Sequence, residues 1–187
     1  MKFTGIVLSG GKSSRMGADK GLLKYNGKMM VEYPLELLAK FCDKILISVN
    51  SENYNAFGYE IIADEIANAG PAGGIAATLK TSKTDWNIVI GCDMPNLNDV
   101  LIQKLIAEVG ALDGIVPIHD GMIEPLVAIY HRSIYTHIEK HLKEGRNAIY
   151  LILKDLKIKY VDISPLLEEF PNLLSNVNSP KDLGFFE

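Results

Sequence analysis

Residues 8–20, with the sequence LSGGKSSRMGADK, concentrate glycines, hydroxyl groups and positive charges in one short stretch. Glycine adopts backbone angles that other residues avoid, so successive N–H groups in such a stretch can converge on an anion. Lysine adds positive charge, and an arginine can hold two phosphate oxygens at once. The stretch contains Gly10, Gly11, Gly17, Lys12, Arg15 and Lys20. This combination is typical of a site for a triphosphate.

The spacing of the glycines excludes the two commonest phosphate-binding loops. A P-loop has the pattern G-x-x-x-x-G-K-[ST], and the GKS at residues 11–13 would need a glycine where the chain has Ile6. A dinucleotide loop has G-x-G-x-x-G, but here two adjacent glycines are followed by the next one only at Gly17. A flexible turn with solvated cations is the alternative, although strand-to-helix connections are usually only about 2 to 6 residues long.

Asp93 lies in the sequence IGCDMP, directly after an apolar run that predicts a buried strand over residues 87–91. A nucleoside triphosphate in water binds Mg²⁺, which takes one or two carboxylates together with phosphate oxygens and waters. Ligands of open α/β sheets bind beyond the carboxyl ends of the strands, where Asp93 is expected to lie. Asp93 is therefore the candidate Mg²⁺ ligand, and an Asx turn that caps the loop is the alternative.

The glycine-rich segment 68–74, NAGPAGG, leaves room for a flat base to lie against bare backbone at the start of a helix. Asp64 follows the short predicted strand 60–63, where an ordinary surface aspartate is one interpretation. Near the end of the chain, Asn176 and Asn178 alternate by two, so in an extended segment both amides project to one side. They can bind a heterocycle or a phosphate, or simply lead into a final helix that starts at Ser179.

The remaining candidate residues carry weaker signals. Lys143 and Arg146 could hold an acceptor's phosphate, although cations at a helix end equally complement the helix dipole. His137 and His141 stand four residues apart, a spacing compatible with zinc, but the chain has no HEXXH motif and no cysteine near them. We interpret this pair as a solvated helix face, and we expect His119 near the acceptor.

The elements that position these residues belong to a single domain of 187 residues, with 48% apolar and 22% charged residues and a net charge of −4. This charge gives no overall attraction to nucleic acid or an anionic membrane. The chain shows neither a signal peptide nor an apolar run long enough to span a membrane. Cys42 and Cys92 are too few for a disulfide framework, so we expect reduced thiols and a cytoplasmic location.

Short β-branched runs alternate with helical patterns, which predicts an α/β fold with a mostly parallel sheet covered by helices on both faces. The strand from Leu126 to Tyr130, after an Asp120-Gly121 turn, is predicted to be an antiparallel excursion. The other predicted strands are residues 3–8, 45–49, 60–63, 87–91, 114–117 and 158–161. The predicted helices are residues 31–41, 73–81, 99–109, 133–143 and 147–155.

Residues 8–20 also fit L-[AS]-G-G-x-S-x-R-M-G-x-D-K, which resembles the signature of the molybdenum cofactor guanylyltransferase family of nucleotidyltransferases. The resemblance extends over nearly the full chain and includes GPAGG at 70–74, GCDMP at 91–95, EPLVAIYHR at 124–132 and NVNSPKDL at 176–183. The first motif is shared with a wider group that moves a nucleotidyl unit from an NTP onto a phosphate. The last motif is the more family-specific one.

The resemblance implies a single-domain, three-layer α/β/α Rossmann-like nucleotidyltransferase fold and transfer of GMP from MgGTP to the terminal phosphate of molybdenum-molybdopterin. The implied catalytic residues are Arg15, Lys20 and Asp93, with Asp93 as the metal ligand. The implied GTP contacts are Leu8, Ser9, Gly10, Gly11, Lys20, Ser48, Asp64, Gly70, Gly74 and Asp93. The implied acceptor contacts are Asn176 and Asn178.

Several alternatives stay open from the sequence. Ser48 stands where the family has an asparagine, so transfer of CMP to the same acceptor remains open, as does transfer to another phosphorylated small molecule. A nucleotide-binding module that has lost turnover and an NAD-dependent dehydrogenase are further alternatives. We expect residues 1–115 to bind the nucleotide and residues 116–187 the acceptor. Transient contact with other cofactor-biosynthesis or target proteins is a further expectation.

Overall fold

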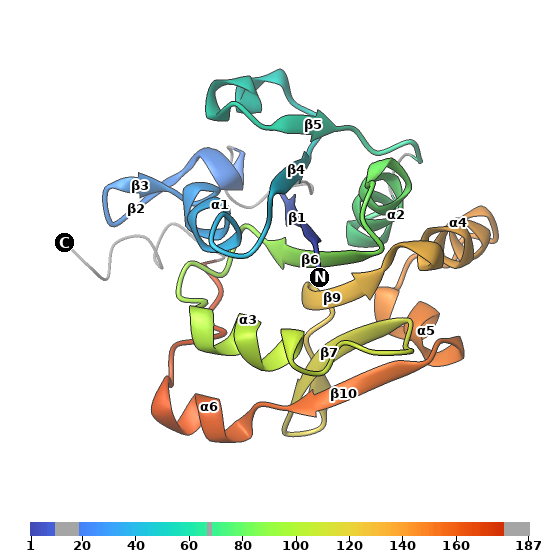
Figure 1. Cartoon of the computed structure of the whole chain (residues 1–187). Helices are drawn as coiled ribbons and strands as arrows, with labels where there is room; N and C mark the ends of the chain where they lie inside the picture. The colour runs from blue at the N-terminus through green and yellow to red at the C-terminus, as the bar shows by residue number, and fades with distance from the viewer. Residues whose placement is uncertain (10–18, 67–68, 178–187) are drawn as a thin grey trace.

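An eight-stranded sheet forms the centre of the computed structural model, which describes residues 1–9, 19–66 and 69–177 (Figure 1). Its strand order is β10-β7-β9-β6-β1-β4-β5, and the short β8 pairs with β7. The strands are β1 (Phe3–Leu8), β4 (Lys44–Ser48), β5 (Glu60–Ile62), β6 (Trp86–Gly91), β7 (Gly114–His119), β8 (Met122–Ile123), β9 (Val127–His131) and β10 (Ile158–Asp162).

Strand directions confirm the predicted mixed sheet. β1 runs parallel to both β4 and β6, β4 runs parallel to β5, and β10 runs parallel to β7. β9 is antiparallel to both β6 and β7 and therefore reverses the direction between two parallel groups. The carboxyl ends of β1, β4 and β6 consequently share one edge of the sheet, where a ligand of an open α/β sheet is expected.

Helices cover both faces of the sheet, which confirms the three layers. Alternate residues of β1 belong to different cores: Phe3 and Val7 to one, Ile6 and Leu8 to the other. The first core includes side chains of α1 (Glu32–Leu38) and α3 (Asp99–Ile106), with α6 (Ser164–Glu169) packed against it. The second includes side chains of α2 (Pro71–Thr81), α4 (Tyr135–Lys143) and α5 (Ile149–Ile152), and α2 lies beside α4 (Figure 1).

Helix boundaries follow local capping chemistry. Asn98 caps α3, because its side-chain oxygen accepts a hydrogen bond from the Leu101 N–H at 3.1 Å. α2 starts two residues before the predicted Gly73, because Pro71 needs no N–H partner in the first turn. The predicted helix 147–155 is wrong as one helix: α5 ends at Ile152, and the 3₁₀ helix η4 (Leu153–Asp155) follows it.

Sequence analysis missed a small hairpin and α6. The hairpin joins β2 (Lys24–Tyr25) to β3 (Lys28–Met29) through Asn26 and Gly27, which both have positive φ. Such an Asn-Gly turn matches the twist of the strands it connects. The expected Asp120-Gly121 turn also has positive φ at both residues and connects β7 to β8. The helix start predicted at Ser179 lies outside the described residues.

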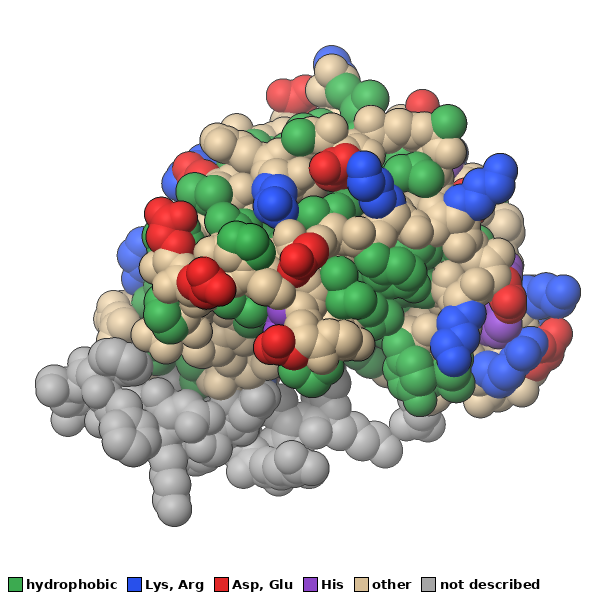
Figure 2. Space-filling model, turned by 90° about the horizontal axis from the view of Figure 1, so that it is seen from below, with side chains coloured by type: hydrophobic (Ala, Val, Ile, Leu, Met, Phe, Trp, Pro, Cys, Tyr) green, Lys and Arg blue, Asp and Glu red, His purple; other side chains and the backbone are tan. Residues whose placement is uncertain are grey.

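The surface carries both signs of charge. Figure 2 shows Lys and Arg side chains interspersed with Asp and Glu over the face seen from below, with apolar side chains between them. Among the described residues, every helix is too short or too polar to cross a bilayer. Both cysteines, Cys42 and Cys92, are free thiols.

Candidate functional site

Three strand ends meet at the candidate site. Leu8, the last residue of β1, is paired with Ser48 of β4 on one side and with Gly91 of β6 on the other. Two backbone bonds extend this pairing past the strands: the Ser9 N–H donates to the Ser48 carbonyl at 2.9 Å, and the Cys92 N–H donates to the Leu8 carbonyl at 3.0 Å. Residues that follow these strands are therefore brought together, as the sequence predicts.

Lys20 and Asp93 form an ion pair beside these strand ends. The Lys20 Nζ lies 3.1 Å from Asp93 Oδ2, and the two side chains are 17% and 28% exposed. The 3₁₀ helix η1 (Lys20–Leu22) carries the lysine, and the turn after β6 carries the aspartate. Two of the three predicted catalytic residues thus adjoin each other across 73 residues of sequence. Arg15, Gly10 and Gly11 lie outside the described residues.

Tyr54, a buried tyrosine that no sequence motif marks, holds Ser9 and Asp19, the residue before Lys20, through hydrogen bonds. The Tyr54 hydroxyl lies 2.6 Å from Ser9 Oγ and donates to Asp19 Oδ1 at 2.5 Å. Asp19 in turn accepts a hydrogen bond from the Gly21 N–H and caps η1. Burial raises the pKa of Tyr54 above its usual value, so the hydroxyl stays protonated and keeps donating.

A second polar group lies at the end of β4. The Ser48 hydroxyl donates to Asp64 Oδ1 at 3.4 Å, and the Asp64 N–H donates to Asn50 Oδ1 at 2.8 Å. Burial raises the pKa of the Asp64 carboxyl, and the hydrogen bond from Ser48 opposes this shift. The sequence analysis also did not predict the role of Asn50, because this residue lies two positions after β4 and belongs to no recognisable motif. It holds the backbone that carries Asp64.

Glycines at the start of α2 allow the helix to pack closely against Ser48 and Asp64. Gly70 caps the helix with φ 62° and ψ −156°, a backbone conformation that is essentially restricted to glycine. A Cβ added to Gly74 would collide with Ser48 Oγ and would lie 3.3 Å from Asp64 Oδ1. The bare backbone predicted for this helix start is therefore required by close packing against Ser48 and Asp64.

The C-terminal part of the described chain reaches Asp93. The Val177 N–H donates to the Asp93 carbonyl at 2.9 Å, and the Val177 side chain is buried with Tyr25 and Met30 of the β2–β3 region. Asn176 is exposed and adjoins this contact, whereas Asn178 lies outside the described residues.

Other sequence candidates fall into two groups. His119 lies 3.1 Å from Glu124, and Arg146 is paired with Glu144, while Lys143 is exposed; their acceptor roles stay predictions. The interpretation of the His137 and His141 pair as a solvated helix face is wrong. His141 is 6% exposed, because α4 turns this side of the helix toward α5 and η4.

The sequence matches the model of the MobA-like NTP transferase domain over residues 5–158. The chain belongs to this family. It is 34% identical over 186 residues to a molybdenum cofactor guanylyltransferase of Vibrio atlanticus, covering 97% of this chain and 93% of that protein. It is 35% identical over 164 residues to a probable molybdenum cofactor guanylyltransferase of Peptoclostridium acidaminophilum, covering 83% and 74%.

Solved structures agree with this assignment of the chain to the MobA-like NTP transferases. A molybdopterin-guanine dinucleotide biosynthesis protein A from Archaeoglobus fulgidus is similar at a TM-score of 0.80 with 28% sequence identity, covering 96% of this chain and 94% of that one. The likeness includes the mixed sheet described above, so the chain is a nucleotidyltransferase in fold and family.

The half-buried Asp64 carboxylate gives this MobA-like transferase a testable pH dependence. A folded-state pKa of Asp64 above the unfolded value means that stability falls as the pH rises through the raised pKa. We expect Asp64→Asn to remove this loss, so the variant gains stability relative to the parent between about pH 4 and pH 7. Urea denaturation at several pH values measures the difference, with the exposed Asp43→Asn as the control. A difference that is constant with pH would contradict the prediction.

Proposed function

We propose that this chain transfers GMP from GTP to the terminal phosphate of molybdenum-molybdopterin, releasing pyrophosphate and forming the guanine dinucleotide cofactor. The observation that carries the proposal is the Lys20–Asp93 pair at the joined carboxyl ends of β1 and β6. Curated relatives named for this activity support it over nearly the full chain. A cation and a carboxylate side by side suit a triphosphate with its divalent ion.

The reaction is one substitution at phosphorus. An oxygen of the acceptor's phosphate forms a bond to the α-phosphorus of GTP, while the bond between that phosphorus and the oxygen leading to the β-phosphorus breaks. Pyrophosphate leaves with the electron pair of that bond. The attacking phosphate is already an anion, so the chain needs no strong general base. Catalysis then consists of positioning the two substrates and neutralising charge.

Asp93 would hold Mg²⁺ in this scheme. Its carboxylate fits a hard cation, because it is partly exposed and one of its oxygens, Oδ2, adjoins the Lys20 ammonium that would share the phosphates. Bound Mg²⁺ would screen the negative charge of the phosphates and of the leaving pyrophosphate. Lys20 and Arg15 would bind phosphate oxygens, and the N–H groups of Gly10 and Gly11 would donate to them from the stretch that follows Ser9.

The second polar group would bind the nucleoside. Asp64 offers acceptor oxygens and Ser48 a hydroxyl, and both face the start of α2. Gly70 and Gly74 leave bare backbone beside them, against which a flat base can lie. Guanine presents two neighbouring N–H donors on one edge, and a carboxylate accepts from such donors.

The acceptor would bind on the other side of Asp93. Asn176 adjoins the contact between Val177 and Asp93, and Asn178 would extend this side with a second amide. We divide the work between residues 1–115 for the nucleotide and 116–187 for the acceptor. We place the reaction in the cytoplasm, where free thiols such as Cys42 and Cys92 stay reduced. Transfer of the product would require transient contact with other proteins of cofactor assembly.

A panel of nucleotides tests this function. GTP, CTP, ATP and UTP are each incubated with the chain and Mg²⁺, with and without molybdopterin acceptor, and released pyrophosphate is measured. We expect release with GTP only when the acceptor is present, and a kcat/KM for GTP about 10²-fold or more above that for CTP. Preferential use of CTP would identify a cytidylyltransferase instead. Nucleotide binding without release from any triphosphate would indicate a binding module.

A further inference from the structure

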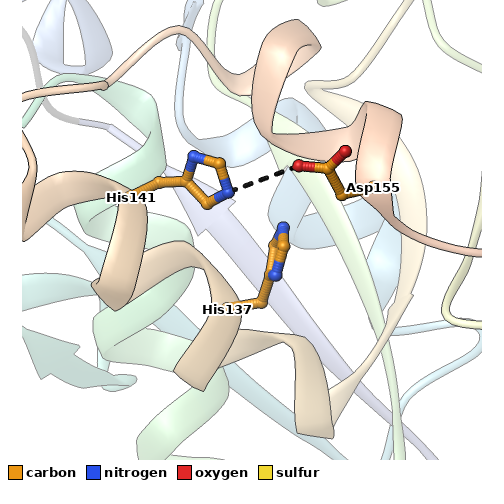
Figure 3. A group of neighbouring side chains, drawn as sticks. All are labelled: His137, His141 and Asp155. Carbon is orange, nitrogen blue, oxygen red and sulfur yellow. Dashed lines mark ion pairs between the residues drawn. The ribbon is translucent and has the colours of Figure 1, made fainter.

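Three metal-ligating side chains converge on the outer helices, away from β1, β4 and β6. His137 and His141 stand one turn apart on α4, with ring centroids 4.6 Å apart. Asp155 ends η4, and its Oδ2 lies 3.8 Å from His141 Nε2. Figure 3 shows the two rings and the carboxylate pointing toward one another. One possible ligand atom from each residue lies within 4.8 Å of the other two.

Both imidazoles can supply a lone pair. Burial lowers the pKa of His141, and the positive charge of Arg146 lowers it further. His137 Nε2 lies 3.1 Å from the Ile152 carbonyl oxygen, an acceptor that can pair only with an N–H. The neutral form of each ring keeps one nitrogen without a proton, and while His137 Nε2 donates to the Ile152 carbonyl that nitrogen is Nδ1. Two imidazoles and one carboxylate are therefore available as ligands.

We propose that His137, His141 and Asp155 form a binding site for a divalent transition-metal ion of the zinc type. Two imidazoles with one carboxylate match zinc, cobalt or nickel better than magnesium, which prefers oxygen ligands. Three protein ligands leave a fourth position of a tetrahedral site for water. The ion connects α4 to the segment formed by α5 and η4, and it is separate from the Asp93 site in both ligands and metal preference.

The three ligand atoms need to move only a short distance toward one another to bind zinc. Ligand atoms around tetrahedral zinc lie about 3.4 Å apart, so the present separations shrink by ~1 Å on binding. Asp155 can move by this amount because its side chain is 66% exposed, while buried His141 stays fixed. The positive charges of Lys140 and Arg146 oppose a cation, but Arg146 is itself paired with Glu144. Without metal, His141 Nε2 still lies 3.8 Å from Asp155 Oδ2, and His137 still bonds to the Ile152 carbonyl.

Isothermal titration of tag-free protein with Zn²⁺, in a large excess of Mg²⁺, tests the site. The excess Mg²⁺ occupies carboxylate sites such as Asp93, so the titration reports on nitrogen-containing sites. We expect one Zn²⁺ per chain, together with a rise in melting temperature that saturates at the same ratio. His137→Asn and His141→Asn should each weaken Zn²⁺ binding by tenfold or more, and Asp155→Asn should weaken it less because its side chain is exposed.

His131→Asn is the matched control, because this ring bonds to Ser133 and packs against Trp86, outside the cluster. It should bind Zn²⁺ like the parent protein. NMR signals of the His137 and His141 rings should shift on titration while that of His131 does not. If His141→Asn fails to fold, the half-buried His137→Asn still decides. The proposal is overturned if the parent shows no saturable Zn²⁺ binding, or if folded His137→Asn binds as tightly as the parent.

Discussion

Asp93→Ala lowers the rate of guanylyl transfer by at least about 10³-fold, because it removes the carboxylate that would hold the divalent ion against the triphosphate. The ion would stabilise charge on both the reacting phosphorus and the leaving pyrophosphate, and the Asp93 carboxylate lies 3.1 Å from Lys20 Nζ. The rate loss should persist at saturating Mg²⁺. Pyrophosphate release under single-turnover conditions measures the effect.

Controls separate this loss from unfolding. The Asp93 carbonyl, which accepts from the Val177 N–H, remains in the variant, so the melting temperature should change little. Asp93→Asn should be nearly as inactive as Asp93→Ala, since it keeps the shape and removes the charge. Asp43→Ala, at a side chain 79% exposed, should leave the rate unchanged. A folded Asp93→Ala variant with more than a tenth of the parent rate would rule out the assigned role.

Gly74→Ala disrupts the packing between α2 and the end of β4, and so weakens GTP binding. Alanine favours a helix interior over glycine by about 1 kcal/mol, but the added Cβ collides with Ser48 Oγ and overpacking costs about 1–3 kcal/mol. We expect the free energy of unfolding to fall by up to about 2 kcal/mol and the KM for GTP to rise about tenfold. Urea denaturation and steady-state kinetics measure the two effects.

A double-mutant cycle tests the cause. Ser48→Ala removes the hydroxyl that meets the new Cβ, so the Ser48→Ala/Gly74→Ala protein should be more stable than Gly74→Ala alone. Gly110→Ala is the matched glycine control, because nothing lies within 4 Å of a Cβ added there. It should leave both stability and KM unchanged. Additive effects of the two substitutions in the cycle would show that the Ser48 contact is not responsible.

The sequence predicts the site best for charged residues that directly follow the carboxyl end of a strand. Lys20 follows a glycine-rich stretch after β1, and Asp93 follows β6. Because the carboxyl ends of parallel strands lie at the same edge of a sheet, the two residues are predicted to lie close together from the positions of the strands alone. The predicted strands and the antiparallel β9 also follow from apolar runs and turn residues. These features depend on local pattern and on topology, both of which are visible in the sequence.

The missed residues depend on tertiary packing. Tyr54 reads as one aromatic residue in a short polar segment, and only the fold places its hydroxyl between Ser9 and Asp19. The sequence predicts His141 in solvent, because no HEXXH motif and no nearby cysteine accompany the His137 and His141 pair. The short segment of α5 and η4 folds back over that side of α4, and a pattern within one helix cannot report what its neighbour covers.

The hydrogen bond from the Val177 N–H to the Asp93 carbonyl can form only after the ribosome has synthesised residue 177. Strands β1, β4 and β6 leave the ribosome early, whereas Val177 emerges only after every strand of the sheet has been made. A nascent chain shorter than this can pair the central strands but lacks the N–H that caps the Asp93 carbonyl. The hydrogen-bonded turn around Asp93 is therefore completed late in translation, and a chain that ends before Val177 lacks this bond.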